Sequence, residues 1–127
     1  MRVLALDYGT ARCGCAVSDP TGTLVTPLSA VEPPDPARIA DLAADHDVDR
    51  VVVGLPITPA GEEGAQARLS RAFAAELQSV LKVPVETYDE RLTTKMADRT
   101  AREGARADRD SLAAAHLLES YLEARNA

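Results

Sequence analysis

The sequence predicts an α/β fold with a mixed five-stranded sheet, in which an antiparallel meander is followed by parallel strands and helices flank the sheet. Three strand-like apolar segments follow one another near the start of the chain, before any helical pattern appears. Strand-like and helical segments then alternate, which is typical of parallel strands joined by helices. The chain has 127 residues, of which 46% are hydrophobic and 27% are charged, and this composition fits one compact domain covering residues 1–127.

The antiparallel part of the sheet is predicted from short apolar runs that turn residues separate. Residues 3–6 form an uninterrupted apolar run that ends at Asp7, and residues 13–18 follow closely enough to form a hairpin with it. A third strand is expected at about residues 22–31. Cys13 and Cys15, the only cysteines, are expected to be buried thiols on one face of the second strand, because their side chains are poorly placed to form a disulfide.

The later elements are predicted from their boundary residues and their apolar spacing. Asp35 and Pro36 suit the start of a helix that continues to about His46, because Asp accepts from the first free amides and Pro fits the first turn. Residues 49–55 contain a β-branched run that suits a strand covered on both faces. A helix is expected at 65–82 and a strand at 83–88, where Pro84 favours the sheet edge. Two helices, at about 94–103 and 110–123, complete the chain.

Acidic residues follow the predicted strands where parallel strands would bring them together. Asp7 follows the first strand, and Asp89 and Glu90 follow the last one. Ligands gather at the carboxyl ends of parallel strands, so these acids and residues 54–56 are expected to be neighbours. A turn role explains Asp7 equally well. Asp110 suits the N-cap of the last helix, and Asp108, two residues earlier, is a second candidate for the same role.

Three carboxylates from separate elements match the ligands that hard divalent cations prefer. Mg²⁺ and Mn²⁺ take oxygen ligands, so Asp7, Glu90 and Asp110 are the predicted metal ligands, with Asp89 as the alternative to Glu90. Two such ions about 4 Å apart activate a water molecule and stabilise the leaving oxygen of a phosphodiester. The predicted catalytic residues are Asp7, Asp89, Glu90 and Asp110.

A local basic stretch is the candidate for binding a nucleic acid. The net charge of −6 argues against binding through the overall field of the protein. Six basic residues between positions 91 and 109 recur at spacings of three and four, which would align most of them on one helical face. A solvated helix face with internal ion pairs explains them equally well. The predicted phosphate contacts are Thr10, Arg12, Arg91, Thr93, Thr94, Lys95, Arg99, Arg102, Arg106 and Arg109.

The sequence shows neither a membrane span nor a signal peptide. Its longest apolar runs have four or five residues, far fewer than a membrane span requires. Asp7 interrupts the first apolar run before the apolar region of a signal peptide could develop. A cytoplasmic protein without a membrane partner is therefore expected.

Six motifs occur in an order that points to one family. The ordered set resembles the bacterial YqgF/RuvX family, and the likeness runs nearly from end to end. The motifs are Asp7-Tyr8-Gly9-Thr10, Gly14-Cys15-Ala16-Val17-Ser18-Asp19, Val53-Gly54-Leu55-Pro56, Gly61-Glu62-Glu63-Gly64, Asp89-Glu90-Arg91-Leu92-Thr93-Thr94 and Asp110-Ser111-Leu112-Ala113-Ala114-Ala115.

The resemblance implies a ribonuclease H-like fold and a nuclease that matures the 5′ end of 16S ribosomal RNA. It makes Asp7 and Asp110 the first and last catalytic aspartates. Related resolvases carry the middle carboxylate at the end of the fourth strand, where this chain has Gly54-Leu55-Pro56, so that role passes to Asp89 or Glu90. Relatives also carry several basic residues just before the last aspartate, and residues 104–109 of this chain contain only two arginines, so weaker phosphate contacts are expected there.

Several functions remain open from the sequence. The leading hypothesis is metal-dependent cleavage of structured RNA. A Holliday junction resolvase acting on branched DNA is the alternative, and it needs two active sites and therefore a homodimer. A non-catalytic nucleic-acid-binding or ribosome-assembly module is a third hypothesis, which the missing carboxylate on the fourth strand supports. A small-molecule phosphotransferase using residues 7–10 is the least favoured, because actin-like kinases need a second lobe that this length cannot supply.

Overall fold

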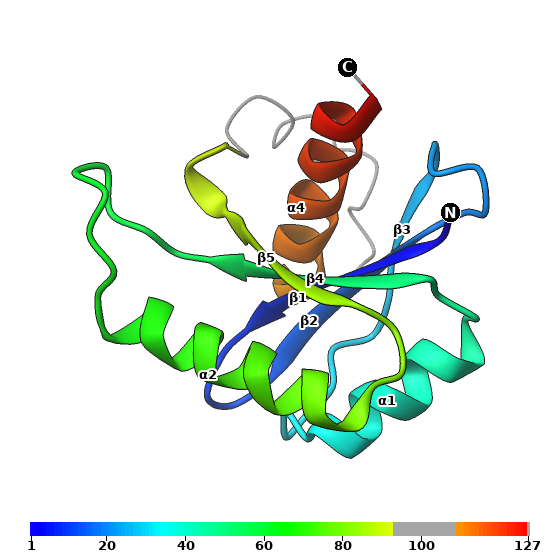
Figure 1. Ribbon diagram of the computed structural model, residues 1–127, viewed down its shortest axis with the longest axis horizontal. Coiled ribbons are helices and arrows are strands. Elements are labelled where there is room, and N and C mark those ends of the chain that lie inside the picture. Colours follow the sequence, from blue (N-terminus) through cyan, green and yellow to red (C-terminus); the bar gives the residue numbers. More distant parts are fainter. Residues whose placement is uncertain (93–108, 127) are drawn as a thin grey trace.

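The computed structural model describes residues 1–92 and 109–126 and contains a five-stranded sheet with helices on both faces (Figure 1). Helices α1 and α2 cover one face, and α4 crosses the other. The predicted helix at 94–103 lies outside the described residues. The strands are β1 (Val3–Tyr8), β2 (Cys13–Ser18), β3 (Val25–Pro27), β4 (Arg50–Leu55) and β5 (Val85–Asp89). The helices are α1 (Pro36–Asp45), α2 (Ala65–Val80), the 3₁₀ helix η1 (Glu90–Leu92) and α4 (Arg109–Asn126).

The strand order is β3-β2-β1-β4-β5. Strands β1, β2 and β3 pair antiparallel, whereas β4 runs parallel to both β1 and β5. The predicted mixed sheet, with a meander first and parallel strands after it, is therefore confirmed. Strand β5 lies at the edge of the sheet, as Pro84 just before it predicted, because a proline has no amide hydrogen to donate to a second neighbouring strand.

Strand β3 is much shorter than predicted, with only Val25–Pro27 in place of residues 22–31. The amides of residues 23 and 24 donate to the Asp19 carboxylate at 2.8 and 3.0 Å, so they are not available to a strand partner. Pro27 has no amide hydrogen to donate to β2. Two local contacts with β2 follow: Leu28 donates to the carbonyl of Cys15 at 2.8 Å, and Val31 and Cys13 exchange backbone hydrogen bonds of 2.9 Å in an isolated bridge.

Helix boundaries follow local hydrogen bonds. Asp35 caps α1 as predicted, and its carboxylate accepts from the amide of Ala37 at 3.0 Å. Helix α2 ends at Val80, two residues earlier than expected, because the side chain of Gln78 bonds both the Val83 carbonyl and the Val85 amide and turns the chain toward β5. Helix α4 begins at Arg109, so Asp110 lies inside its first turn.

The alternating side chains of the strands build a separate apolar core on each face of the sheet. Leu4 and Leu6 of β1 pack toward α1 and α2, where Tyr8 stacks on Phe73 with ring centroids 4.4 Å apart. Val3 and Ala5 pack toward α4. By this alternation Asp7 belongs to the α4 face of the sheet.

Cys13 and Cys15 are both fully buried thiols in the α1/α2 core and form no disulfide, as predicted. The hydrogen bond with Cys15, together with burial, raises the pKa of the Cys13 thiol far above its ordinary value. Both cysteines therefore act as small apolar residues.

Polar contacts at both ends hold α4 against the sheet. Near its start, the hydroxyl of Ser111 accepts from the amide of Cys15 at 3.2 Å. Near its end, Tyr121 donates to Glu86, which also accepts from Arg50 at 2.9 Å. Burial would raise the pKa of Glu86, but these two partners outweigh it and lower the pKa. Within the described ranges, no helix is long and apolar enough to cross a bilayer.

Candidate active site

Three chain segments meet at the carboxyl edge of the parallel strands. Leu6 of β1 pairs with Val53 of β4, so the residues that follow them, Asp7 and Gly54, are neighbours. Gly54 pairs in turn with Tyr88 of β5, two residues before Glu90. The expected meeting of the acids with residues 54–56 is confirmed.

Glu90 contacts Asp7 across the end of β4. The pKa of Glu90 is raised to about 7, first by burial, then by the negative charge of Asp7 and by a hydrogen bond between the two carboxyl groups. In this bond the protonated Glu90 donates to the Asp7 carboxylate, since hydrogen bonding to the neutral form raises the pKa of an acid. The two side chains thus form a carboxyl pair on the α4 face of the sheet.

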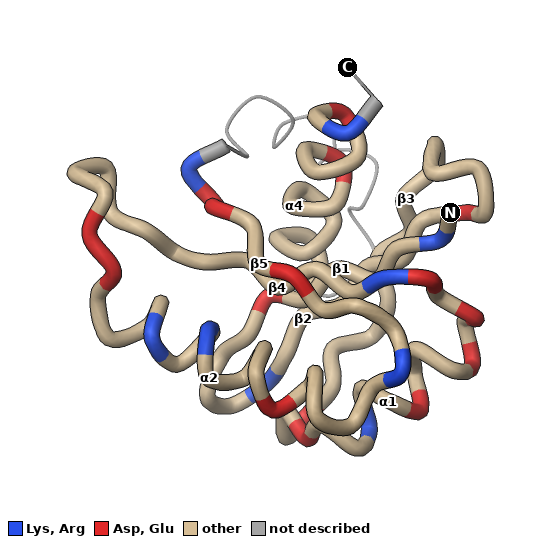
Figure 2. The backbone as a smooth tube through the Cα atoms, in the orientation of Figure 1, with Lys and Arg blue, Asp and Glu red and all other residues tan. Residues whose placement is uncertain are grey.

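Asp89 points to a different partner, although it is adjacent to Glu90. The Nε atom of Arg91 donates to both carboxylate oxygens of Asp89, at 3.1 and 2.9 Å, and Nη2 donates to Oδ2 at 2.5 Å. The hydrogen bond from Arg91 holds the pKa of Asp89 below its ordinary value. Figure 2 shows an acidic segment (red) followed by a basic one (blue) at the end of β5. The structure therefore brings Glu90 to Asp7 and Asp89 to Arg91.

The first turn of α4 lies beside the carboxyl pair. Ser111 is fully buried and bonds the amide of Cys15, and Cys15 pairs with Leu6, the residue before Asp7. The backbone of Asp110 is therefore near the pair, whereas its side chain is outside what the structure describes. A helix N-terminus carries a partial positive charge, which favours anions nearby.

The predicted phosphate contacts are only partly described. Thr10 and Arg12 are exposed in the loop between β1 and β2, and the Arg12 side chain lies 3.5 Å from Glu32. Arg91 is exposed beyond the end of β5. Thr93, Thr94, Lys95, Arg99, Arg102 and Arg106, together with Asp108 and the side chain of Arg109, lie outside the described residues.

The carboxyl pair fits a divalent cation chemically. Burial and the charge of Asp7 both disfavour an ionised Glu90, and a hard cation between the two carboxyl groups would offset both effects. Among the described side chains, no group of three His, Cys, Asp or Glu residues gathers to hold a metal. If a cation binds here, the pair would supply two oxygen ligands, and a third would come from outside the described side chains.

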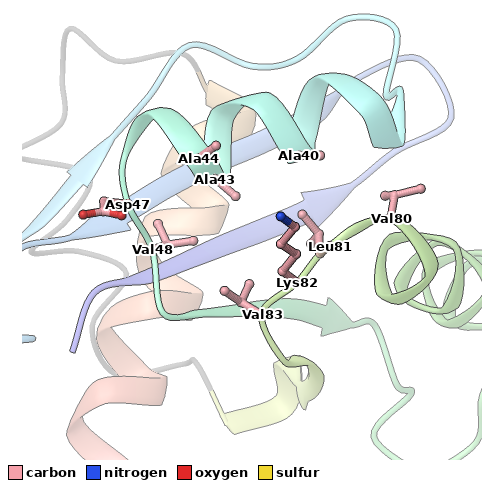
Figure 3. Close-up of a pocket in the computed structure, with 9 residues that line it drawn as sticks. All are labelled: Ala40, Ala43, Ala44, Asp47, Val48, Val80, Leu81, Lys82 and Val83. Atoms are coloured by element: carbon pink, nitrogen blue, oxygen red, sulfur yellow. The ribbon is translucent and has the colours of Figure 1, made fainter.

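An apolar pocket of about 330 Å³ lies away from this edge (Figure 3). Residues at the C-terminal ends of α1 and α2 line it, together with Lys82 and Val83, which precede β5. Since the pocket is lined by residues just before β5, whereas Glu90 directly follows β5, the two sites lie at opposite ends of the strand. Asp47 is the only carboxylate in its lining, so it is a poor candidate for metal chemistry.

The raised pKa of Glu90 predicts how stability varies with pH in metal-free protein. Between about pH 4.5, the ordinary value, and pH 7, the folded state holds a proton that the unfolded state has lost. Unfolding free energy should therefore fall as pH rises through this range, and the loss should be complete above pH 7. Because Glu90 is partly exposed to screening solvent, we expect an effect on the order of 1 kcal/mol.

Chemical denaturation in EDTA at several pH values measures this dependence. In the variant Glu90→Gln, the unfolding free energy should fall less steeply with pH, because the contribution of Glu90 is removed and that of the other groups stays. An unchanged slope in the variant would show that the two carboxyl groups do not interact in solution.

Comparisons with known proteins relate nearly the whole chain to one family. Residues 1–124 match the model of the RuvX family, described as Holliday junction resolvase. A protein of Chloroflexus aurantiacus, provisionally named pre-16S rRNA nuclease, is 41% identical and covers 97% of this chain and 87% of its own. One of Anaeromyxobacter dehalogenans with the same name is 42% identical, and the match covers 98% of both chains. The structure of Thermus thermophilus RuvC with a Holliday junction substrate has a TM-score of 0.72 at 15% identity, covering 99% of this chain and 96% of that one, which shows a shared fold.

Proposed function

Because the chain belongs to the RuvX family and brings Glu90 against Asp7 at the edge of its sheet, we propose that it is a divalent-metal-dependent nuclease that processes the 5′ end of pre-16S rRNA. Its relatives in Chloroflexus and Anaeromyxobacter are provisionally named pre-16S rRNA nucleases, which supports a nuclease with this substrate. In this proposal residues 1–127 form one nuclease domain that acts in the cytoplasm. The carboxyl pair of Asp7 and Glu90 is the observation that carries the proposal.

The proposed metal ligands are Asp7, Glu90 and Asp110, which would hold Mg²⁺ or Mn²⁺. The ion supplies Lewis acidity at the scissile phosphate and lowers the pKa of a bound water molecule. Asp7 comes from β1, Glu90 from the end of β5 and Asp110 from the first turn of α4, so three rigid elements fix the ligand geometry. Asp89 has a supporting role, because it holds the guanidinium of Arg91 in a fixed orientation.

The substrate backbone is proposed to lie along the same edge. Thr10, Arg12 and Arg91 are exposed there and offer donors that suit phosphate oxygens. The basic residues between positions 95 and 109 would extend this contact. Contacts of this kind recognise the backbone and the shape of a structured RNA and not its base sequence.

Incubation of the full-length protein with a pre-16S rRNA fragment that contains the 5′ leader tests the proposal. We expect cleavage with Mg²⁺ or Mn²⁺ and none in EDTA. RNA that is bound in a salt-dependent way but stays intact with every divalent ion would contradict the proposal and favour a non-catalytic binding module.

Cleavage of four-way DNA is a second candidate function. The match to a family described as Holliday junction resolvase and the fold shared with RuvC favour it. A resolvase cuts two strands symmetrically and needs two copies of the site, so it requires a homodimer. Paired symmetric nicks in a synthetic junction, with a dimer in sedimentation, would support this function. A monomer at the assay concentration would exclude it.

Loss of the Arg91 guanidinium is expected to weaken nucleic-acid binding. The side chain is exposed at the end of β5, beside the carboxyl pair. For Arg91→Ala we expect the binding free energy for RNA to weaken by roughly 1 kcal/mol. The slope of log affinity against log salt concentration should become shallower by about one phosphate contact. Titration of labelled RNA at several salt concentrations measures both. Lys82→Ala is the matched control, because it removes one exposed positive charge at the other end of β5. Equal effects of the two variants would contradict a specific contact.

A further inference from the structure

We infer that Gly54 is a positioning residue of this site, because its lack of a side chain leaves the space over β4 in which the Glu90 carboxyl group reaches Asp7. The catalytic consequence of this inference rests on the proposed nuclease function. The placement of Glu90 rests on geometry alone.

Strand β4 lies between the two strands that carry the carboxyl pair. Neighbouring strands are about 4.8 Å apart, so the backbones of β1 and β5 are separated by roughly 10 Å. Glu90 must therefore extend its side chain across β4 to meet Asp7. The Glu90 side chain crosses β4 at Gly54. Gly54 pairs with Tyr88 of β5, and the residue before it, Val53, pairs with Leu6 of β1.

The side chain of Glu90 fills the space that any larger residue at position 54 would need. A Cβ atom placed on Gly54 would lie 2.5 Å from Oε1 of Glu90 and 3.2 Å from its Cδ and Cγ atoms. Backbone conformation does not require this glycine, because the described glycines with positive φ are Gly22 and Gly61. Position 54 therefore requires glycine because the Glu90 carboxyl group occupies the space of a side chain there.

Gly54→Ala is expected to push the Glu90 carboxyl group away from Asp7 without unfolding the protein, because the atom in conflict is the free end of a side chain. We expect Mn²⁺ to bind at least about 10-fold more weakly, as when an interaction that orients a ligand is lost. Cleavage of the pre-16S fragment should fall by at least the same factor. Calorimetric titration of the full-length protein with Mn²⁺ gives a readout that does not depend on activity.

Gly64→Ala is the matched control. An added Cβ at Gly64 meets nothing within 4 Å. The same substitution there should leave Mn²⁺ binding and cleavage at the level of the unaltered protein. Gly64 is the N-cap residue of α2, where alanine is less favourable than glycine, so its change in Tm is a generous reference for a glycine replaced by alanine without a clash.

A relocated carboxylate provides a rescue. The 2.5 Å between the added Cβ and Oε1 of Glu90 matches the span from Cβ to a carboxylate oxygen within an aspartate. The double variant Gly54→Asp with Glu90→Ala should therefore place an oxygen near the position that Glu90 now occupies. It should bind Mn²⁺ more tightly than either Gly54→Ala or Glu90→Ala alone.

Thermal unfolding in EDTA tests the steric claim without any metal. Gly54→Ala should change Tm more than Gly64→Ala does, and this excess should disappear in the Glu90→Ala background. An excess that persists without Glu90, or Mn²⁺ affinity equal to that of the unaltered protein in Gly54→Ala, would overturn the inference. Failure of the unaltered protein to bind Mn²⁺ or cleave RNA would instead overturn the proposed function, while the Tm comparison still decides the role of Gly54.

Discussion

Replacement of Asp7 by asparagine is expected to lower metal-dependent cleavage at least about 100-fold, since one ligand supplies several kcal/mol of transition-state stabilisation through the ion. The same variant should be more stable than the unaltered protein when metal is absent. Above about pH 7, where Glu90 is ionised, it repels Asp7, and this repulsion adds to burial in raising the pKa of Glu90. An amide at position 7 removes the repulsion and can donate a hydrogen bond to the Glu90 carboxylate. We expect a gain of roughly 1 kcal/mol, or a few degrees in Tm.

Opposite changes in activity and stability would mark Asp7 as a residue retained for function. Single-turnover cleavage of the pre-16S fragment measures the first change, and thermal unfolding in EDTA at pH 8 measures the second. Activity within a few-fold of the unaltered protein would remove Asp7 from the proposed mechanism. A large loss of stability would instead show that its main role is structural, as in the turn alternative that the sequence left open.

Glu90→Gln and Asp89→Asn should differ strongly, although the two residues are adjacent. Glu90 lies against Asp7, whereas both oxygens of Asp89 accept hydrogen bonds from Arg91. For Glu90→Gln we expect a loss of at least about 100-fold in cleavage and weaker Mn²⁺ binding. For Asp89→Asn we expect less than about a 10-fold loss, because an exposed ion pair contributes little energy and the guanidinium loses only its orientation.

Each variant serves as the control for the other, since both remove one negative charge at the same end of β5. The rate of cleavage and the Mn²⁺ affinity should rank the variants in the same order. If Asp89→Asn had the larger effect on both, Asp89 would be the middle ligand, and the carboxyl pair would require another explanation.

The arrangement of the strands could be predicted from the sequence because it depends on patterns along the chain. The patterns before Asp7 and Asp89 located β1 and β5, although β1 continues to Tyr8 and β5 includes Asp89, and Pro84 indicated the edge position. The length of β3 could not be predicted, because the Asp19 carboxylate and Pro27 withdraw amides from the ladder. A side chain that competes for backbone amides leaves no periodic signal in the sequence.

The candidate site was predictable as a set of acids, but the partner of each acid was not. Asp89 and Glu90 are adjacent and both carry a carboxyl group, so the sequence does not distinguish them. Only the backbone conformation at the end of β5 directs Asp89 to Arg91 and Glu90 to Asp7. The role of Gly54 was also missed. Its signal was a glycine directly after the β-branched run of β4, where a glycine weakens a strand and often marks a close approach by another group.

A crystal soaked in Mn²⁺, with anomalous scattering collected for the metal, tests the central claim most directly. The account predicts an anomalous peak at the carboxyl edge of the sheet, about 2.1 Å from oxygens of Asp7 and Glu90 and in reach of the first turn of α4. A peak coordinated by Asp89 in place of Glu90, or no peak near Asp7 at millimolar Mn²⁺, would contradict it.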